Sequence, residues 1–117
     1  MSSEQLKPRT EAGHFFSTDI RVGRILEVQE FPEARKPAYR FTADFGPAAG
    51  VLRTSAQVTN YPMDELKGRL IIGVINLGAK RIAGFTSEFL VLGSYGSDGT
   101  VNLLSPEPHA AVGDIVG

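Results

Sequence analysis

Hydrophobic and polar residues alternate over several short stretches of the chain, which predicts β-strands. The clearest alternation covers residues 39–45, whose apolar and aromatic side chains share one face: Tyr39, Phe41, Ala43 and Phe45. The side chains between them fall on the other face: Arg40, Thr42 and Asp44. We expect a strand with one buried and one wet face.

Three more strands follow from the same pattern. Residues 20–28 are predicted to form the first strand, with Ile20, Val22, Leu26 and Val28 on alternate positions. Gly23 within it indicates a bulge or a sharp bend. Residues 51–57 return from a turn at residues 46–50. Residues 69–76 are almost continuously apolar, which predicts a strand covered on both faces.

Shorter elements complete the prediction. Residues 60–68 are expected to form one or two helical turns, with Pro62 near the start and Gly68 at the end. Residues 89–92 are read as a buried fifth strand. Asp98-Gly99 marks a hairpin turn before a short strand at residues 101–104. Residues 112–116 are expected to close the chain as a short strand or edge segment.

This order of elements predicts an all-β protein with an OB-fold: a Greek-key barrel with a short helix between strands 3 and 4. Extra segments precede and follow the barrel. At 117 residues the chain suits a single domain, residues 1–117, with residues 1–13 as a flexible arm. The pair Phe15 and Phe16 must be buried, in the chain's own core in preference to a partner.

Composition removes several function classes. Hydrophobic residues make up 42% and charged residues 21%, and no apolar run has the length of a signal peptide or a membrane span. A cytoplasmic protein without membrane insertion is expected. With no cysteine and two unpatterned histidines, we expect no metal and no cofactor. No nucleophile elbow or paired-carboxylate pattern involves Asp44, Ser55, Ser87, Glu88 or the histidines, so an enzyme is not expected.

Charge is unevenly distributed along the chain. All 12 lysines and arginines lie at or before Arg81, so residues 1–81 carry a net charge of +3, whereas residues 82–117 carry −4. This separation favours a basic face on a weakly acidic molecule.

Two loops combine these cations with apolar residues. The first, residues 30–37, contains two prolines, and the second is bounded by Gly78 and Gly84. Apolar contact with nearby positive charge suits a tolerant peptide site, and a sheet edge could also hold an extended peptide. The candidate peptide-binding residues are Phe31, Pro32, Arg35, Lys36, Pro37, Asn76, Lys80, Arg81 and Phe85.

A nucleic-acid site is the rival interpretation. Cations on the strands and the second loop would neutralise phosphates, while Tyr39 or Phe85 stacks on a base. The candidate residues are Arg40, Arg53, Lys80, Arg81 and Ser87. The net charge of −1 weighs against this reading, because phosphate binders are strongly basic.

Five linked motifs carry a resemblance to a known family. They are DIRVGRI from Asp19, FPEARKPA from Phe31, DFG from Asp44, SAQ from Ser55 and RIAGFTSEFLVLG from Arg81. In order and spacing they resemble the bacterial CsaA proteins, export-related chaperones related to the tRNA-binding domains of methionyl- and phenylalanyl-tRNA synthetases. Those tRNA binders usually read HPxADKL and SEGM or SQGM where this chain reads FPEARKP and SEFL, which favours the chaperone branch.

The resemblance implies a homodimer that binds unfolded or presecretory polypeptides in apolar cavities flanked by positive charge. The protein-export machinery is a further implied partner, and tRNA is a less favoured one. Terminal segments outside the barrel would form the dimer interface. Its candidate residues are Phe15, Phe16, Leu103, Leu104, Val112 and Ile115.

Overall fold

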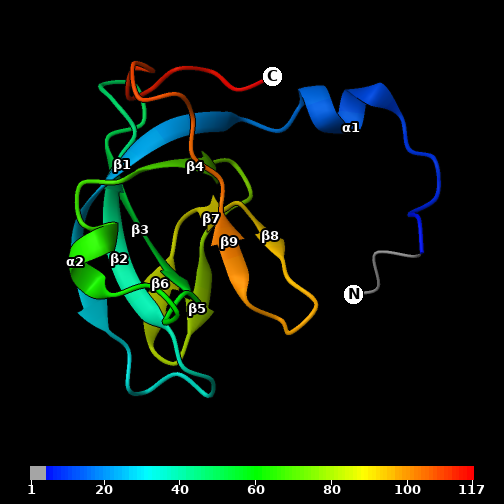
Figure 1. The fold of residues 1–117 in the computed structure, drawn as a ribbon. Helices are drawn as coiled ribbons and strands as arrows, with labels where there is room; N and C mark the ends of the chain where they lie inside the picture. The colour runs from blue at the N-terminus through cyan, green and yellow to red at the C-terminus, as the bar shows by residue number, and fades with distance from the viewer. Residues whose placement is uncertain (1–4) are drawn as a thin grey trace.

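The computed structural model describes residues 5–117 of the protein (Figure 1). Its helices are α1 (Ala12–Phe16) and α2 (Met63–Leu66). Its strands are β1 (Ile20–Glu30), β2 (Tyr39–Asp44), β3 (Val51–Ala56), β4 (Leu70–Val74), β5 (Lys80–Ile82), β6 (Phe85–Ser87), β7 (Leu90–Val91), β8 (Gly93–Tyr95) and β9 (Val101–Leu103).

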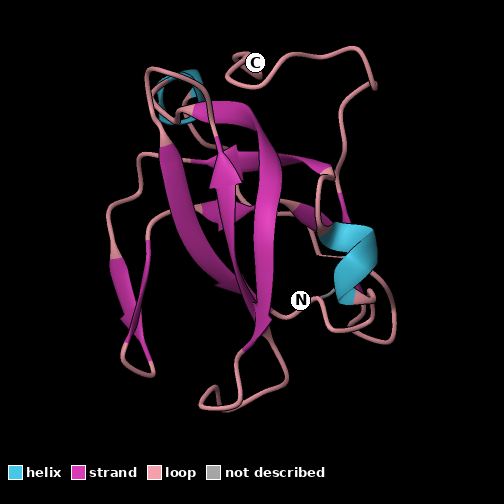
Figure 2. Cartoon of the chain, turned by 90° about the vertical axis from the view of Figure 1, so that its left-hand side faces the viewer, coloured by secondary structure: helices cyan, strands magenta, loops and turns pink. Residues whose placement is uncertain are grey.

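The main sheet has five antiparallel strands in the order β3-β2-β1-β4-β7, and it curls into a nearly closed barrel (Figures 1 and 2). Two contacts join the sheet ends. The Glu88 N–H donates to the Arg53 carbonyl at 2.7 Å, and Thr54 Oγ1 donates to the Phe89 carbonyl at 2.6 Å. With α2 between β3 and β4, this architecture confirms the predicted OB-fold.

Phe45 fills the centre of the barrel because glycines on the adjacent strands β1 and β4 leave room for its ring. A Cβ built on Gly23 or Gly73 would lie 2.7 Å from a Phe45 ring carbon. The other large buried side chains around it include Ile25, Leu66 and Ile71. The predicted burial of Phe41, Ala43 and Phe45 on one face of β2 is therefore confirmed.

β1 differs from its prediction in one respect. The register with β2 shifts between Ile25 and Glu27, which is a β-bulge. Ile25 is buried in the core on the same face of β1 as Gly23, and Leu26, which follows it at the bulge, is 36% exposed, so the assignment of Leu26 to the buried face is wrong. A bulge was correctly expected in this strand, but Gly23 serves the close packing of Phe45 instead.

β4 is covered on both faces, as its apolar run predicts. Ile71 belongs to the barrel core, whereas Ile72 and Val74 pack on the opposite side with Ile20 and Val22. The C-terminal segment covers this second cluster: the Val116 N–H donates to the Ile20 carbonyl at 2.8 Å. The predicted closing edge segment is thus present as a bridge to β1.

The segment after β4 contains a hairpin that the sequence reading missed. β5 and β6 pair antiparallel around Ala83 and Gly84, which have φ values of 48° and 81°. Positive φ at both central residues is the signature of a type I′ turn. The expected four-residue buried strand shortens to β7, and its Leu90 is 51% exposed.

The ends of the chain bring two further corrections. Phe15 and Phe16 are 47% and 76% exposed, so their expected burial in the chain's own core is wrong. Leu103, a candidate interface residue, is 7% exposed because it packs into the barrel core. Of the expected arm, residues 1–4 lie outside the described residues, and residues 5–11 are exposed.

Within residues 5–117, no helix combines the length and apolarity needed to span a membrane.

Candidate functional site

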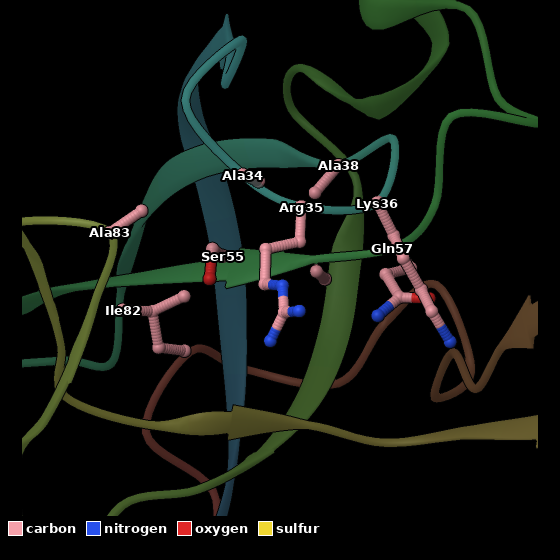
Figure 3. A pocket seen from close by; sticks show the side chains of 9 residues that line it. Ala34, Arg35, Lys36, Ala38, Ser55, Gln57, Ile82 and Ala83 are labelled. Carbon is pink, nitrogen blue, oxygen red and sulfur yellow. The ribbon is translucent and has the colours of Figure 1, made fainter.

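The barrel opens along one line, where β3 and the β5–β6 hairpin diverge. Beyond Arg53 and Thr54 the two segments separate, and an open pocket of about 750 Å³ lies between the hairpin, β3 and the loop at residues 31–38. We call this hollow the seam pocket. Its lining residues are Ala34, Arg35, Lys36, Ala38, Ser55, Ala56, Gln57, Ile82 and Ala83 (Figure 3).

Three elements form the walls of the seam pocket. Ile82 and Ala83 come from the hairpin tip, and Ser55 and Gln57 from β3 and the residue just after it. The loop supplies Arg35, whose guanidinium projects into the middle of the view in Figure 3. Small side chains such as alanine leave the strand backbone accessible between these walls.

Phe31 holds the loop in place from beneath. Its side chain is 3% exposed, and its backbone exchanges hydrogen bonds within the loop: its N–H donates to the Ala38 carbonyl and its carbonyl accepts from Ala34, both at 3.2 Å. The expectation that Phe31 contributes an exposed apolar surface is therefore wrong. A buried ring at the loop base fixes the position of the exposed residues that follow it.

Two arginines and two aromatic rings pack next to each other on the outer face of the sheet. The Phe31 and Phe85 ring centroids are 5.5 Å apart. The Arg40 guanidinium lies 5.4 Å from the Phe31 centroid, and that of Arg53 lies 5.6 Å from Phe85, both cation–π distances. A second pocket of about 330 Å³ lies over this face and includes Arg40, Arg53 and Phe85.

Part of this positive charge is already compensated. Arg53 forms an ion pair with Glu88 at 3.6 Å, and both side chains are more than a third exposed, so the pair is weak. Arg40 keeps a buried Nε without a hydrogen-bond partner among the described residues. Within residues 5–117 neither Arg35 nor Lys36 forms an ion pair, so the seam pocket retains two uncompensated cations.

The predicted peptide-binding residues separate into three groups. Arg35 and Lys36 line the seam pocket, and Arg35 also lines an adjoining hollow of about 480 Å³ that includes Phe31, Pro32 and Pro37. Lys80 and Arg81 are exposed on the hairpin outside both.

Asn76 has a structural contact instead. Its side chain accepts from the Asp19 N–H and donates to the Ser17 carbonyl, both at 2.8 Å, which ties the end of β4 to the start of β1.

The nucleic-acid candidates are also divided. Arg40 and Arg53 share the second pocket, while Arg81 donates to Thr86 Oγ1 at 3.1 Å on the hairpin. The Ser87 hydroxyl lies 2.9 Å from Thr54 Oγ1 at the barrel seam. Ser87 therefore helps to attach the hairpin to β3.

Several residues of the seam pocket were not singled out from the sequence. Ile82 and Ala83 were missed because the β5–β6 hairpin was read as an irregular connection. Gln57 and Ser55 stand in the SAQ motif of the resemblance, but nothing in that motif assigns them to a pocket.

Within the described residues, no three His, Asp or Glu side chains are grouped so as to hold a metal ion.

Comparison with known proteins agrees with this fold. The family model described as "Putative tRNA binding domain" matches residues 20–115. The chain belongs to this family. Methionine--tRNA ligase from Porphyromonas gingivalis is 32% identical over 102 residues, which are 87% of this chain and 15% of that enzyme. The chain thus spans about a seventh of the length of the curated relatives it matches.

Two solved structures of CsaA proteins are similar to this chain over nearly its whole length. The crystal structure of the CsaA chaperone protein from Picrophilus torridus has a TM-score of 0.89 and 46% identity, and the alignment covers 93% of this chain and all of that one. Chaperone CsaA from Bacillus anthracis has a TM-score of 0.88 and 39% identity, with 94% and 100% covered. The predicted resemblance to CsaA proteins is therefore confirmed.

Proposed function

We propose that this protein is a chaperone that binds unfolded polypeptides in the seam pocket. The similarity to two CsaA chaperone proteins over their whole length supports a binding module of the same kind. The observation that carries the proposal is the pocket itself. It is open to solvent, has apolar walls at Ile82, Ala83 and Ala38, and has Arg35 and Lys36 without ion-pair partners among residues 5–117.

The chemistry of this pocket suits varied clients. Apolar walls bind aliphatic and aromatic side chains without demanding one shape, and a cation at the rim pairs with acidic side chains. Folded proteins bury most of their apolar side chains, so an open apolar pocket selects unfolded chains. Presecretory polypeptides, which stay unfolded before export, are the clients that we infer, with the protein in the cytoplasm and the export machinery as a partner.

The homodimer is part of the same proposal. Phe16 is 76% exposed just before β1, and Ile115 is 74% exposed where the C-terminal segment bridges to Arg21 of β1. Exposed apolar side chains on the two segments next to the start of β1 favour burial against a second copy. Leu104, Phe15 and Val112 complete the proposed interface, from which Leu103 is removed.

Binding of tRNA is the second candidate. The family match favours it, together with Arg40 and Arg53 beside the Phe31–Phe85 pair. Against it, Phe31 is buried and Glu88 pairs with Arg53, so one ring is closed to a base and one cation is partly neutralised. The unfolded polypeptide is therefore the preferred ligand.

Suppression of aggregation tests the proposal. We expect the protein to slow the light scattering of heat-denatured citrate synthase, and Ile82→Asp to weaken this about tenfold because a charge replaces an apolar wall. Val51→Asp is the matched control, since Val51 is an exposed apolar residue at the other end of β3. Equal protection by Ile82→Asp and the unaltered protein would contradict a role for the pocket.

A further inference from the structure

One edge of β3 is paired at its start and open at its end. In an antiparallel strand the N–H and carbonyl of one residue point to the same side, and successive residues alternate. Both backbone groups of Arg53 point away from β2: its carbonyl accepts from the Glu88 N–H at 2.7 Å, and its N–H donates to Glu88 Oε1 at 3.2 Å. The register with β2 then places the backbone groups of Ser55 on the same outer edge, and Gln57 follows directly after the end of β3.

These outer groups have no strand beside them. Within residues 5–117, the N–H groups of Ser55 and Gln57 and the Gln57 carbonyl make no hydrogen bond, and the Ser55 carbonyl has only a 3.4 Å contact from Thr54 Oγ1. Both residues line the seam pocket. The pocket floor therefore offers unpaired backbone donors and acceptors at Ser55, inside the strand, and at Gln57, directly after it.

We propose that this edge pairs with an extended segment of an unfolded polypeptide, so that the client adds a strand to β3 at Ser55 and Gln57. The proposal rests on the proposed chaperone function and defines how the pocket holds its client. Main-chain pairing supplies affinity that is independent of client sequence. The walls at Ile82 and Ala38 then receive apolar side chains on one face of the added strand.

The charge of the pocket selects the kind of segment. Arg35 and Lys36 project from the loop at one side, without an ion-pair partner among the described residues, and no acidic residue lines the pocket. An extended segment with an acidic side chain next to apolar ones meets both features. We therefore infer a preference for acidic over basic segments.

A nucleic-acid strand fits this edge less well. The edge presents carbonyl acceptors as well as N–H donors, whereas ionised phosphates only accept hydrogen bonds. A polypeptide backbone supplies both donor and acceptor in each residue. The phosphates of an RNA strand could not donate a hydrogen bond to the Gln57 carbonyl.

Amide hydrogen exchange measured by NMR tests the pairing directly. The probe is reduced, carboxymethylated α-lactalbumin, a permanently unfolded acidic protein, added to saturation. We expect exchange at Ser55 and Gln57 to slow at least tenfold. Thr54 and Ala56, whose amides already point to β2, should be unchanged.

The outcomes separate this inference from the function on which it rests. Binding of the probe with unchanged exchange at Ser55 and Gln57 overturns strand addition and leaves the chaperone proposal standing. Failure of the probe to bind overturns both. Protection of the same two amides by tRNA and not by the probe also overturns the proposal.

A pair of proline variants gives a second test. Ser55→Pro removes an outward N–H without removing a bond to β2, and we expect probe affinity to fall at least tenfold. Val51→Pro is the control, because the backbone N–H of Val51 also points away from β2 but Val51 lies outside the seam pocket. Equal affinities of the two folded variants would refute the pairing. If Ser55→Pro does not fold, the exchange result on the unaltered protein decides.

Discussion

Phe45 shows how single residues determine this barrel. Its ring lies in the centre, against the backbones of Gly23 on β1 and Gly73 on β4. Neither glycine has a positive φ, so they are needed for space and not for backbone conformation. Interiors are packed too densely for such a contact to absorb an extra methyl group without movement.

Gly73→Ala should therefore destabilise the protein by about 1–3 kcal/mol through overpacking. The new Cβ would lie 2.7 Å from Phe45 Cζ and 3.1 Å from Phe89 Cδ2. Urea denaturation followed by circular dichroism measures the change. Gly13→Ala in α1 is the control, because no atom lies within 4 Å of its built Cβ and stability should not fall. Equal losses in both variants would contradict this account.

At the same residue scale, the sequence predicted burial correctly on β2 and less well near the chain ends and in the loops. Alternation was enough to assign Phe41, Ala43 and Phe45 to the core, because period two fixes the face of each side chain. Phe31 was misassigned because a single aromatic residue in a proline-rich loop carries no periodicity. Its burial depends on Phe85, which lies far along the chain.

At the scale of elements, the β5–β6 hairpin depends on its attachment to β3. Thr54 is 2% exposed, and its hydroxyl contacts both the Phe89 carbonyl and Ser87 Oγ. Alternation predicted β2, but it could not predict this hairpin, because three-residue strands are too short for a pattern. The Ala83-Gly84 turn also lacks the usual Asn-Gly or Asp-Gly signal.

Thr54→Val should lower stability by about 1–3 kcal/mol, because the Phe89 carbonyl loses its hydroxyl donor in the interior. Exchange of the Glu88 amide, which bonds to Arg53 beside this site, should accelerate. Thr42→Val on the wet face of β2 is the control, with no such acceleration. Unchanged Glu88 exchange in Thr54→Val would refute the attachment.

The β8–β9 hairpin has a pH-dependent turn. Hydrogen bonds from the Thr100 N–H, at 2.9 Å, and from its hydroxyl lower the pKa of Asp98 below its ordinary value. The turn is thus stabilised above the pKa of Asp98 in the unfolded chain, and this is lost as the pH falls through the lowered folded pKa. NMR titration should give a lower midpoint than in a peptide of residues 95–101, and equal midpoints would contradict the prediction.

At the scale of the whole molecule, the sequence predicted the overall fold correctly. The order of strands and the short helix were sufficient for the OB-fold, since few topologies accommodate that order. The seam pocket could not be predicted, because it depends on where β3 and the hairpin separate. That separation is a tertiary feature without a local sequence signal.

Association between molecules belongs to this scale as well. If exposed Phe16 lies in a dimer interface, Phe16→Asp should convert the dimer to a monomer by burying a charge. Sedimentation velocity at several concentrations measures this. Met63→Asp is the control, since Met63 is exposed at the first turn of α2, where an acidic residue is favourable. A monomeric unaltered protein, or a Phe16→Asp variant that remains dimeric, would contradict the interface.

We propose that the seam pocket binds unfolded polypeptide in preference to RNA. The most direct measurement is fluorescence anisotropy of labelled, reduced and carboxymethylated α-lactalbumin, with unlabelled tRNA as competitor, at 50 mM and 200 mM salt. We predict that the polypeptide binds at both salt concentrations with less than about a tenfold change, whereas phosphate-driven tRNA binding would fall far more steeply. Displacement of the polypeptide by stoichiometric tRNA at 200 mM salt would contradict the account.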